Sequence, residues 1–596
     1  MCIIFFPHAR YLCVNKENTI LEVKDLSVAF GGRMVVDHIS YTLRRGRTLG
    51  IVGESGSGKS VSSLALMGLL PKQATVSGQA LLSDMSDPSD QSDLLSLDEA
   101  GFRNIRGHRI SMIFQEPMTS LNPVQRCGAQ VLEMMRAHLP KDLKDPKDLK
   151  DQVIALFREV LLPRPEKIFD SYPHEISGGQ KQRVMIAMAL INHPDIIIAD
   201  EPTTALDVTV QKTILDLLKS LQQKYGISII FITHDLGVIA QIADDIMVMY
   251  RGKMVEQGPA ADILHHPREP YTQGLLACRP PLDAKPRRLP TVEDYLEGVK
   301  RSEKGVKRSE RTNVQDDANV PSLPLTPSLS LSLLSVKNLS VTYTLKRSIF
   351  GKPLETLKGV DGVSFDIREG ETLGLVGESG CGKTTLGRAL LRLIDHSSGS
   401  VSYRGTPLDQ LSSQEMRALR PKLQIIFQDP YSSLNPRITI GDAIAEPLKV
   451  HRNTLNNPNT QNTQKDTVLA LMQQVGLDPD WYGRYPHELS GGQRQRVCIA
   501  RALILQPELV VCDESVSALD VSVQAQVLNL LNDLKERYRF TYLFITHDLS
   551  VVHYMADRIM VMQKGKVVES GTPDDLFRRP QTDYTRTLID AIPRII

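Results

Sequence analysis

The sequence lacks three features that would each assign it to a definite class of protein. Its 596 residues contain no apolar run that approaches the roughly 18 residues of a membrane-spanning helix. Its seven cysteines are scattered and form no C-x-x-C pair, which indicates neither a zinc site nor a disulfide framework and favours a reducing compartment. Its 70 basic residues nearly balance its 69 acidic residues, so the net charge of +1 gives no reason to expect nucleic-acid binding.

The length of the chain predicts roughly four structural units of about 150 residues each. An apolar content of 41% suffices for substantial cores, which suits two halves that each hold a core and a smaller subdomain. Residues 1–19 are expected to be a disordered extension. Their apolar stretch from Cys2 to Phe6 has no basic region and stops at Pro7, so it is too short for a signal peptide.

One glycine-rich pattern occurs twice, each time after a strand-like run, residues 48–52 and residues 372–376. Both copies fit G-x-x-x-x-G-K-[ST], in which glycines let successive N–H groups face phosphate oxygens at the positive N-terminus of a helix. The lysine offers charge to the β- and γ-phosphates, and the final hydroxyl reaches Mg²⁺. The predicted nucleotide-binding residues are Gly53, Glu54, Ser55, Gly56, Ser57, Gly58, Lys59 and Ser60, and again Gly377, Glu378, Ser379, Gly380, Cys381, Gly382, Lys383 and Thr384.

The two halves of the chain are copies of one another. Residues 20–28 align with residues 333–341 at an offset of 313, and the same offset relates Ser177 to Ser490. The two loop lysines are instead 324 residues apart, which requires an insertion in each half. The inferred insertions are a segment around residues 346–355 in the second half and a surface segment at residues 83–99 in the first.

Residues 283–332, between the halves, are predicted to be a flexible linker. A mixed-charge tract at residues 300–310 precedes a segment rich in Pro, Ser and Leu, in which prolines 321, 324 and 327 block any long helix. A contact with lipid headgroups or a regulatory contact is the alternative interpretation. The predicted domains are therefore residues 20–282 and residues 333–596.

Two apolar segments end in a pair of carboxylates, at Asp200-Glu201 and at Asp513-Glu514. The segments are predicted to be buried parallel strands, which would deliver each Asp to a strand end beside Mg²⁺. The following Glu can polarise an attacking water. A core strand that simply meets surface acids is the alternative, but the pattern stands behind a phosphate loop in both halves.

A Ser-Gly-Gly-Gln turn precedes a helix-like segment in each half, residues 181–192 and residues 494–505. A turn of this kind that opens a helix is another anion cradle, although alone it would indicate little more than a loop. Each copy lies 23 residues before its strand-end Asp. The residues are Ser177, Gly178, Gly179 and Gln180, and Ser490, Gly491, Gly492 and Gln493.

In this order the motifs resemble the ATP-binding cassette family, over about 530 of the 596 residues. The family order is phosphate loop, glutamine loop, signature, Asp-Glu strand end, S/T-A-L-D loop and switch histidine. The resemblance implies an α/β fold with two tandem cassettes, each a phosphate-loop core with helical and antiparallel β subdomains. The remaining motif residues are the glutamines Gln115 and Gln428, the loops at residues 204–207 and 517–520, and the histidines His234 and His547.

The family mechanism implies a role for each motif residue. Two cassettes meet head-to-tail, so Lys59 and Ser60 would face the second signature, and Lys383 and Thr384 the first. Glu201 and Glu514 would be general bases, and His234 and His547 would contact the γ-phosphate. Mg²⁺ and water would be organised by Ser60, Gln115 and Asp200 in the first half, and by Thr384, Gln428 and Asp513 in the second. Phe30 and Tyr343 fall where the family stacks an aromatic ring on adenine, although a lone aromatic near a strand end is more often core.

Two small departures from the family pattern affect no charged catalytic group. Ile176 precedes the first signature where Leu489 precedes the second, and Ser515 stands where the first half has Pro202. We therefore expect both ATP sites to hydrolyse ATP.

Longer stretches resemble the ATPases of bacterial dipeptide, oligopeptide and nickel importers, and a fused pair resembles the subgroup that serves glutathione, microcin-like or other peptides. This resemblance implies two integral-membrane permeases and a periplasmic solute-binding protein as partners, and a peripheral position on the cytoplasmic face of the inner membrane. It implies no direct contact with the transported solute, whose identity the sequence does not reveal. The stretches are residues 114–123 and 427–436, 208–211 and 521–524, and 267–272 and 580–585.

Other tandem or single cassettes are less consistent with the sequence. A nickel or other small-solute importer is the nearest alternative. Soluble translation factors join their halves by a long charged helix, whereas prolines interrupt this linker. Excision-repair proteins need zinc-spaced cysteines, and exporters usually carry fused membrane helices.

Overall fold

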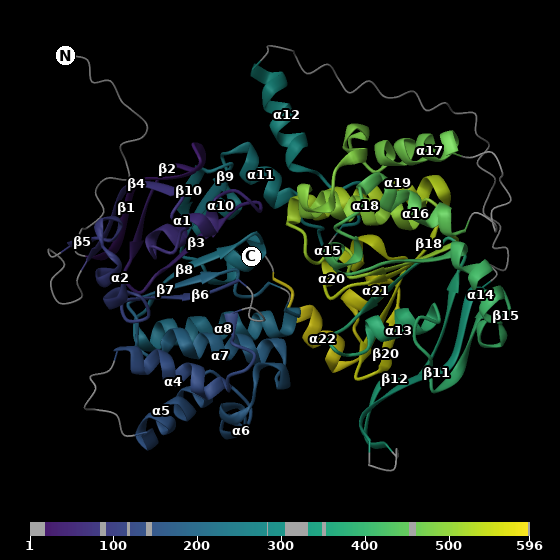
Figure 1. Cartoon of the computed structure of the whole chain (residues 1–596), viewed down its shortest axis with the longest axis horizontal. Helices are drawn as coiled ribbons and strands as arrows, with labels where there is room; N and C mark the ends of the chain where they lie inside the picture. The colour runs from purple at the N-terminus through teal and green to yellow at the C-terminus, as the bar shows by residue number, and fades with distance from the viewer. Residues whose placement is uncertain are drawn as a thin grey trace. The chain divides into compact units, whose positions relative to one another are not determined.

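The structure is a computed structural model of the chain (Figure 1). It describes residues 18–83, 91–115, 120–138, 146–204, 206–282, 284–303, 332–347, 353–451 and 461–593. The described chain forms two compact units. The first unit holds the chain up to Leu206 and Val210–Leu276, and the second holds Asp207–Thr209 and Ala277–Ile592.

The first unit contains two sheets. A six-stranded sheet has the order β10-β9-β3-β8-β7-β6 and is parallel except for its edge strand β10. A four-stranded antiparallel sheet has the order β2-β1-β4-β5. The strands are β1 (Thr19–Phe30), β2 (Arg33–Arg44), β3 (Thr48–Val52), β4 (Ala74–Ser83), β5 (Gln91–Asp93), β6 (Ile110–Ile113), β7 (Ile196–Asp200), β8 (Ser228–Thr233), β9 (Asp245–Tyr250) and β10 (Lys253–Pro259).

Helices cover the parallel strands, which explains their sequence. Every residue of β3, β7 and β8 is buried, and such strands read as continuous apolar runs because both faces of the sheet are covered. Figure 1 shows α4 to α8 gathered on one side of the six-stranded sheet and the antiparallel sheet on the other. The helices are α1 (Lys59–Leu66), α2 (Glu99–Ile105), α4 (Cys127–His138), α5 (Pro146–Glu159), α6 (Pro165–Asp170), α7 (Gly178–Leu190), α8 (Val208–Tyr225), α9 (Leu236–Ile242), α10 (Ala260–His265) and α11 (Pro270–Ala277).

The second unit repeats this architecture. Its six-stranded sheet has the order β16-β17-β18-β13-β19-β20 and its antiparallel sheet the order β12-β11-β14-β15. The strands are β11 (Ser332–Arg347), β12 (Pro353–Arg368), β13 (Thr372–Val376), β14 (Ser398–Tyr403), β15 (Thr406–Pro407), β16 (Leu423–Ile426), β17 (Leu509–Asp513), β18 (Thr541–Ile545), β19 (Arg558–Gln563) and β20 (Lys566–Gly571). The helices are α12 (Val292–Glu303), α13 (Lys383–Leu390), α14 (Ser413–Leu419), α15 (Pro430–Ser433), α16 (Ile440–Val450), α17 (Gln461–Gln474), α18 (Gly491–Leu503), α19 (Val521–Tyr538), α20 (Leu549–Met555), α21 (Pro573–Arg578) and α22 (Asp583–Asp590).

The predicted fold class is confirmed: each unit has a phosphate-loop core with an antiparallel sheet and a group of helices. The helices after the signatures begin three residues earlier than predicted, at Gly178 and Gly491, because Ser177 and Ser490 cap them. No helix in the described part of the chain is long and apolar enough to cross a membrane.

The predicted linker differs from the structure in its first part. Residues 284–303 are described and group with the second unit, and residues 292–303 form α12. Just before this helix, Thr291 donates two hydrogen bonds to the Asp294 carboxylate, from its N–H and from its hydroxyl, each at 2.8 Å. The proline-rich segment lies outside the described residues, as do residues 1–17 of the predicted extension and residues 84–90 of the predicted insertion.

Both central strands approach a helix so closely that only glycine fits. A Cβ added at Gly374 in β13 would lie 2.2 Å from Val552 Cγ2 in α20, and one at Gly50 in β3 would lie 2.6 Å from Ile239 Cδ1 in α9.

We expect Gly374→Ala to lower the free energy of unfolding by about 1–3 kcal/mol, because the helix must shift to admit the methyl group. Denaturant unfolding of the nucleotide-free protein would measure it. Gly483→Ala is the control, since a Cβ there would meet nothing within 4 Å; equal losses in both variants would contradict the prediction.

Candidate functional site

In each unit the phosphate loop lies between the central strand and the helix that follows. Gly58 and Gly382 adopt left-handed backbone conformations, φ 98° and 110°, at the N-terminus of α1 and α13. A Cβ at Gly58 would lie 2.9 Å from the Val35 carbonyl oxygen, so a side chain is excluded there by conformation and by space. Neither helix has a side-chain cap, which leaves its first N–H groups for an anion.

The loop lysines are buried and hydrogen-bonded to their own loops. Lys59 Nζ donates to the carbonyl oxygens of Gly53 at 2.7 Å and Glu54 at 2.8 Å. Lys383 Nζ makes the same contacts in the second unit, at 2.7 and 3.0 Å. Each ammonium group is thus held over the loop, where a phosphate would meet it.

The hydroxyl that ends each loop contacts the strand-end Asp. Ser60 Oγ donates to Asp200 Oδ1 at 2.9 Å, and Thr384 Oγ1 donates to Asp513 Oδ1 at 2.8 Å. Burial raises the pKa of Asp200 to about 6, because it disfavours the charged carboxylate, and it raises the pKa of Asp513 as well. A hydroxyl and a desolvated carboxylate are oxygen donors of the kind that Mg²⁺ prefers, so the residues present fit this cation.

The glutamate after each Asp is surrounded by the other predicted site residues of its unit. Glu201 accepts from Gln115 Nε2 at 3.0 Å and from Thr204 Oγ1 at 2.8 Å, and it forms an ion pair with His234 Nδ1 at 3.3 Å. Burial opposes the ionisation of Glu201, but the hydrogen bond and charge of His234 outweigh it and lower its pKa to about 2.

Glu514 has a similar environment in the second unit. It accepts from Gln428 Nε2 at 2.8 Å and lies 3.6 Å from His547 Nδ1 and 3.8 Å from Lys383 Nζ. Although burial opposes ionisation, His547 lowers the pKa of Glu514, and Glu514 in turn raises the pKa of His547 against the effect of burial. Ser517 differs from Thr204, because its hydroxyl donates to the Glu514 backbone carbonyl and not to the carboxylate.

Both glutamates have a left-handed backbone, φ 46° for Glu201 and 47° for Glu514. This conformation is uncommon for a residue with a side chain and costs about 1–3 kcal/mol. Hydrogen bonds from the two amides to Ile232 and Ile545, each at 2.9 Å, hold it in place. The turn directs the carboxylate toward the edge of the sheet where the phosphate loop ends.

Each signature is a capping box. Ser177 Oγ accepts from the Gln180 N–H at 3.4 Å while Gln180 Oε1 accepts from the Ser177 N–H at 3.0 Å, and Ser490 and Gln493 do the same at 3.3 and 2.9 Å. The second glycine packs on the following long helix: a Cβ at Gly179 would lie 2.7 Å from Val210 Cγ1. The pairing of signatures with phosphate loops, which involves both units, stays a prediction.

The two predicted adenine-stacking aromatics lie in different environments. Phe30 ends β1 and packs partly buried against the core of the first unit. Tyr343 in β11 is 41% exposed, and its hydroxyl donates to Thr385 Oγ1 at 3.4 Å, next to the phosphate-loop helix. An exposed ring beside the loop suits stacking better than a core ring does.

The sequence reasoning missed one contact of the phosphate loop. The Glu54 N–H donates to Tyr271 Oη at 3.1 Å, and the Glu378 N–H donates to Tyr584 Oη at 3.1 Å. Both tyrosines belong to the repeated tail segments at residues 267–272 and 580–585. The repetition of the Tyr-Thr pair behind each copy was the signal that could have indicated this contact.

These features define a class. A glycine loop on a helix N-terminus, a buried lysine, a hydroxyl on a strand-end Asp and a neighbouring Glu are the parts of a phosphate-loop ATPase, and the chain carries them twice.

Comparisons with known proteins identify the family. The sequence matches the ABC transporter family over residues 36–204 and 360–517, and the C-terminal region of oligopeptide/dipeptide transporters over residues 255–312 and 568–596. It is 43% identical to the glutathione import ATP-binding protein GsiA of Pectobacterium atrosepticum, over 97% of this chain and 90% of that protein. It is 45% identical to GsiA of Escherichia coli, over 98% of this chain and 91% of that protein. The dimeric post-hydrolysis structure of the ATP-binding cassette MJ0796 bound to ADP and Pi is 26% identical, with a TM-score of 0.37 over 40% of this chain and 98% of that one.

The chain therefore belongs to the ABC transporter family, in which it is a fused pair of ATP-hydrolysing cassettes of the oligopeptide/dipeptide transporter type. An ATP-binding subunit of this kind works with membrane permeases.

We expect Asp200 to make stability depend on pH in metal-free buffer. Its pKa of about 6 lies above its unfolded value of 3.8, so the folded state binds more protons between these values and the free energy of unfolding falls as pH rises from about 4 to 6. Asp200→Asn should remove up to about 3 kcal/mol of this loss, raise stability at neutral pH and abolish hydrolysis. Calorimetric unfolding in EDTA across this pH range would measure it. The exposed Asp216→Asn is the control, and parallel pH profiles for wild type and Asp200→Asn would contradict the prediction.

We expect Tyr271→Phe and Tyr584→Phe to weaken ATP binding by a few-fold while leaving the fold intact, because each loses one hydrogen bond to a loop amide, worth about 0.5–1.5 kcal/mol. Titration with a fluorescent ATP analogue would measure the dissociation constant. Tyr225→Phe, which removes a hydroxyl that contacts Glu159 away from the loop, is the control. An ATP affinity unchanged in both tail variants would show that the loop does not need these hydroxyls.

Proposed function

We propose that this chain is the motor subunit of an importer that uses ATP at two sites to take up a peptide, with glutathione as the first candidate cargo. The repeated C-terminal region of oligopeptide/dipeptide transporters behind both cassettes carries this proposal. The glutathione assignment is supported by the relatives, which resemble this chain over nearly its whole length.

At each site the chain positions the reacting groups. Lys59 and Lys383, with the loop amides, bind the β- and γ-phosphates. Ser60, Gln115 and Asp200 in the first unit, and Thr384, Gln428 and Asp513 in the second, would hold Mg²⁺, which would supply positive charge beside the phosphate oxygens. Glu201 and Glu514 accept the proton of the attacking water. Catalysis of this kind consists mostly of positioning and charge stabilisation.

The contact between His234 and Glu201 suggests how the base is kept inactive before ATP arrives. A carboxylate whose pKa is about 2 is a weak base at neutral pH. When His234 turns to the γ-phosphate, Glu201 loses the partner that lowers its pKa and becomes a stronger base. His547 and Glu514 work in the same way. Hydrolysis is thereby linked to the presence of the γ-phosphate.

The two sites are composite: Ser490–Gln493 close the site of Lys59, and Ser177–Gln180 close the site of Lys383. In each capping box the serine hydroxyl accepts from an amide N–H, so its own O–H can still donate to a phosphate oxygen when the site closes. Closure of the fused cassettes is intramolecular, which replaces a dimerisation equilibrium by an effective concentration.

Two permeases and a periplasmic solute-binding protein complete the transporter, and the chain lies on the cytoplasmic face of the inner membrane. Cargo is selected by these partners, and the chain itself touches no solute. Each glutamine loop, between the catalytic Glu and the helical group of its unit, transmits closure to the permease.

Uptake by cells tests the proposal. We expect deletion of the gene to abolish uptake of labelled glutathione, and wild type but not Lys59→Ala/Lys383→Ala to restore it. Dipeptides, longer peptides and nickel are the alternative cargoes to be measured in parallel, and the exposed Lys72→Ala is the control for expression. Loss of nickel uptake alone would replace the peptide assignment, and unchanged uptake of all four would refute import of these solutes.

We expect both sites to hydrolyse ATP. The single variants Glu201→Gln and Glu514→Gln, assayed with purified transporter, should lose similar fractions of ATP turnover. A turnover that one variant abolishes and the other leaves near wild type would show that one site is degenerate.

A further inference from the structure

The chain that leaves the first unit is bound to the second by residues 284–292, which we call the anchor. We propose that the anchor is an intramolecular docking segment that keeps the two cassettes joined even without the covalent connection through residues 304–331. This inference concerns the assembly of the chain and does not depend on the transported solute.

The centre of the docking site is Asn529 in α19. Its side-chain amide pairs with both the backbone N–H and the backbone carbonyl of Leu289, as a neighbouring β-strand would. The Leu289 N–H donates to Asn529 Oδ1 at 2.9 Å, and Asn529 Nδ2 donates to the Leu289 carbonyl oxygen at 2.8 Å. Asn529 is 2% exposed and Leu289 is 1% exposed. Buried polar groups that satisfy one another in this way are costly to separate, because each would be left without a partner.

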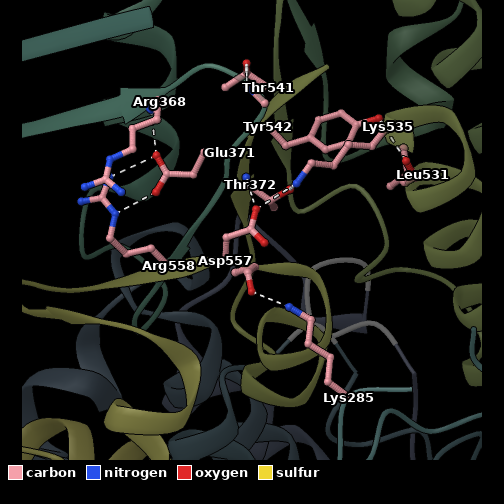
Figure 2. A network of polar contacts seen from close by, with 12 residues as sticks. Lys285, Arg368, Glu371, Thr372, Leu531, Lys535, Thr541, Tyr542, Asp557 and Arg558 are labelled. Carbon is pink, nitrogen blue, oxygen red and sulfur yellow. Dashed lines mark hydrogen bonds and ion pairs between the residues drawn. The ribbon is translucent and has the colours of Figure 1, made fainter. Parts of the chain in front are cut away.

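A second helix, α20, completes the site. Tyr554 Oη donates to Asn529 Oδ1 at 3.1 Å and to the Arg287 carbonyl oxygen at 3.4 Å. Lys285 Nζ donates to the Ala556 carbonyl oxygen at 2.7 Å, just after the end of α20 (Figure 2). Figure 2 also shows Asp557, which accepts from the Thr372 N–H and so ties this end of the helix to β13.

Exposed ion pairs add little to the docking. Arg287 pairs with Glu536 at 3.4 Å and Arg288 with Asp533 at 3.3 Å, but more than half of each side chain is exposed. Such pairs contribute weakly and are screened by salt. Leu289, by contrast, is buried and its backbone N–H and carbonyl are both paired with Asn529, so high salt should not release the anchor.

The docking site is particular to the second unit. The offset of 313 aligns Asn529 with Asp216 and Tyr554 with Gln241 in the first unit. The side-chain carboxylate of Asp216 has no N–H to donate and is exposed on α8, so the first unit cannot hold a backbone segment in the same way. The duplicated cores therefore differ at the position where the chain between them binds.

Docking shortens the connection between the units. The chain from α11 to the anchor is residues 278–283, whereas an undocked connection would run to β11. Because effective concentration falls roughly as the −3/2 power of tether length, this shortening raises it on the order of tenfold. The anchor contacts α19 and α20, and these helices directly follow the 517–520 loop and His547 in the sequence.

Cleavage of the full chain tests the anchor. A site for a sequence-specific protease is placed within residues 304–331, and the purified protein is cut in EDTA without nucleotide, so that ATP cannot hold the units together. We expect the two fragments to co-elute in size-exclusion chromatography over a dilution series, at 0.05 M and at 1 M salt.

Two variants should release the fragments. Asn529→Asp replaces the N–H that serves the Leu289 carbonyl by an oxygen, and it should raise the dissociation constant of the fragments about tenfold or more. Leu289→Pro removes the N–H from the anchor itself and leaves α19 unchanged, so it tests the contact without altering the second unit's core. Asp216→Asn makes the reverse exchange at the aligned position and should have no effect.

Fragments of the cut wild type that separate as readily as those of the variants would overturn the proposal. Variants whose fragments stay together as firmly as those of wild type would overturn it equally, because other contacts would then join the units. Neither outcome depends on glutathione uptake, so a failure here is distinct from a failure of the proposed function.

Discussion

The phosphate loop is fixed by contacts between backbone atoms, and the rest of each unit is arranged around that constraint. A Cβ at Gly53 would lie 2.2 Å from the Met249 carbonyl oxygen, and one at Gly377 would lie 2.2 Å from that of Met562. The loop can therefore pack against the end of a neighbouring strand only while it carries no side chain there. Because β7 and β8 are parallel to the central strand, their carboxyl ends reach the same edge. Asp200, Glu201 and His234 are brought to the loop by strand order alone.

Much of this could be predicted from residue patterns. A motif whose spacing is fixed by a helix, a turn or a strand end, such as Lys59 and Ser60 or Ser177 and Gln180, reports its local geometry directly. The hydrogen bond of Gln115 to Glu201 was not predicted, since it depends on which strands are neighbours, and the resemblance placed Gln115 only near Mg²⁺ and water. The anchor was not foreseen for a different reason: a segment with few apolar residues and two prolines resembles a solvated linker, and Asn529 lies 240 residues beyond Leu289.

The site contains residues whose burial or backbone conformation lowers the stability of the fold but which the chemistry requires. Asp200 is buried with a raised pKa, and Glu201 and Glu514 have left-handed backbones. Each would be more stable as another residue, Asn for the Asp and Gly for the strained Glu, but neither replacement could perform the reaction. The surrounding apolar strands, in which every residue is buried, supply the stability that permits these defects.

Duplication explains why the two sites agree in their chemistry, but it does not explain why the connecting chain binds to one copy and not to the other. Identical copies would offer identical surfaces, and a connecting chain could dock on either. Two differences remove this ambiguity: the second copy has a buried Asn529 where the first has an exposed Asp216, and Tyr554 where the first has Gln241. Only the second copy can therefore pair with both the N–H and the carbonyl of the same residue. The difference lies on the helices behind the site and changes no residue that faces the nucleotide. The copies can thus remain alike where they hydrolyse ATP and differ where the chain must distinguish one from the other.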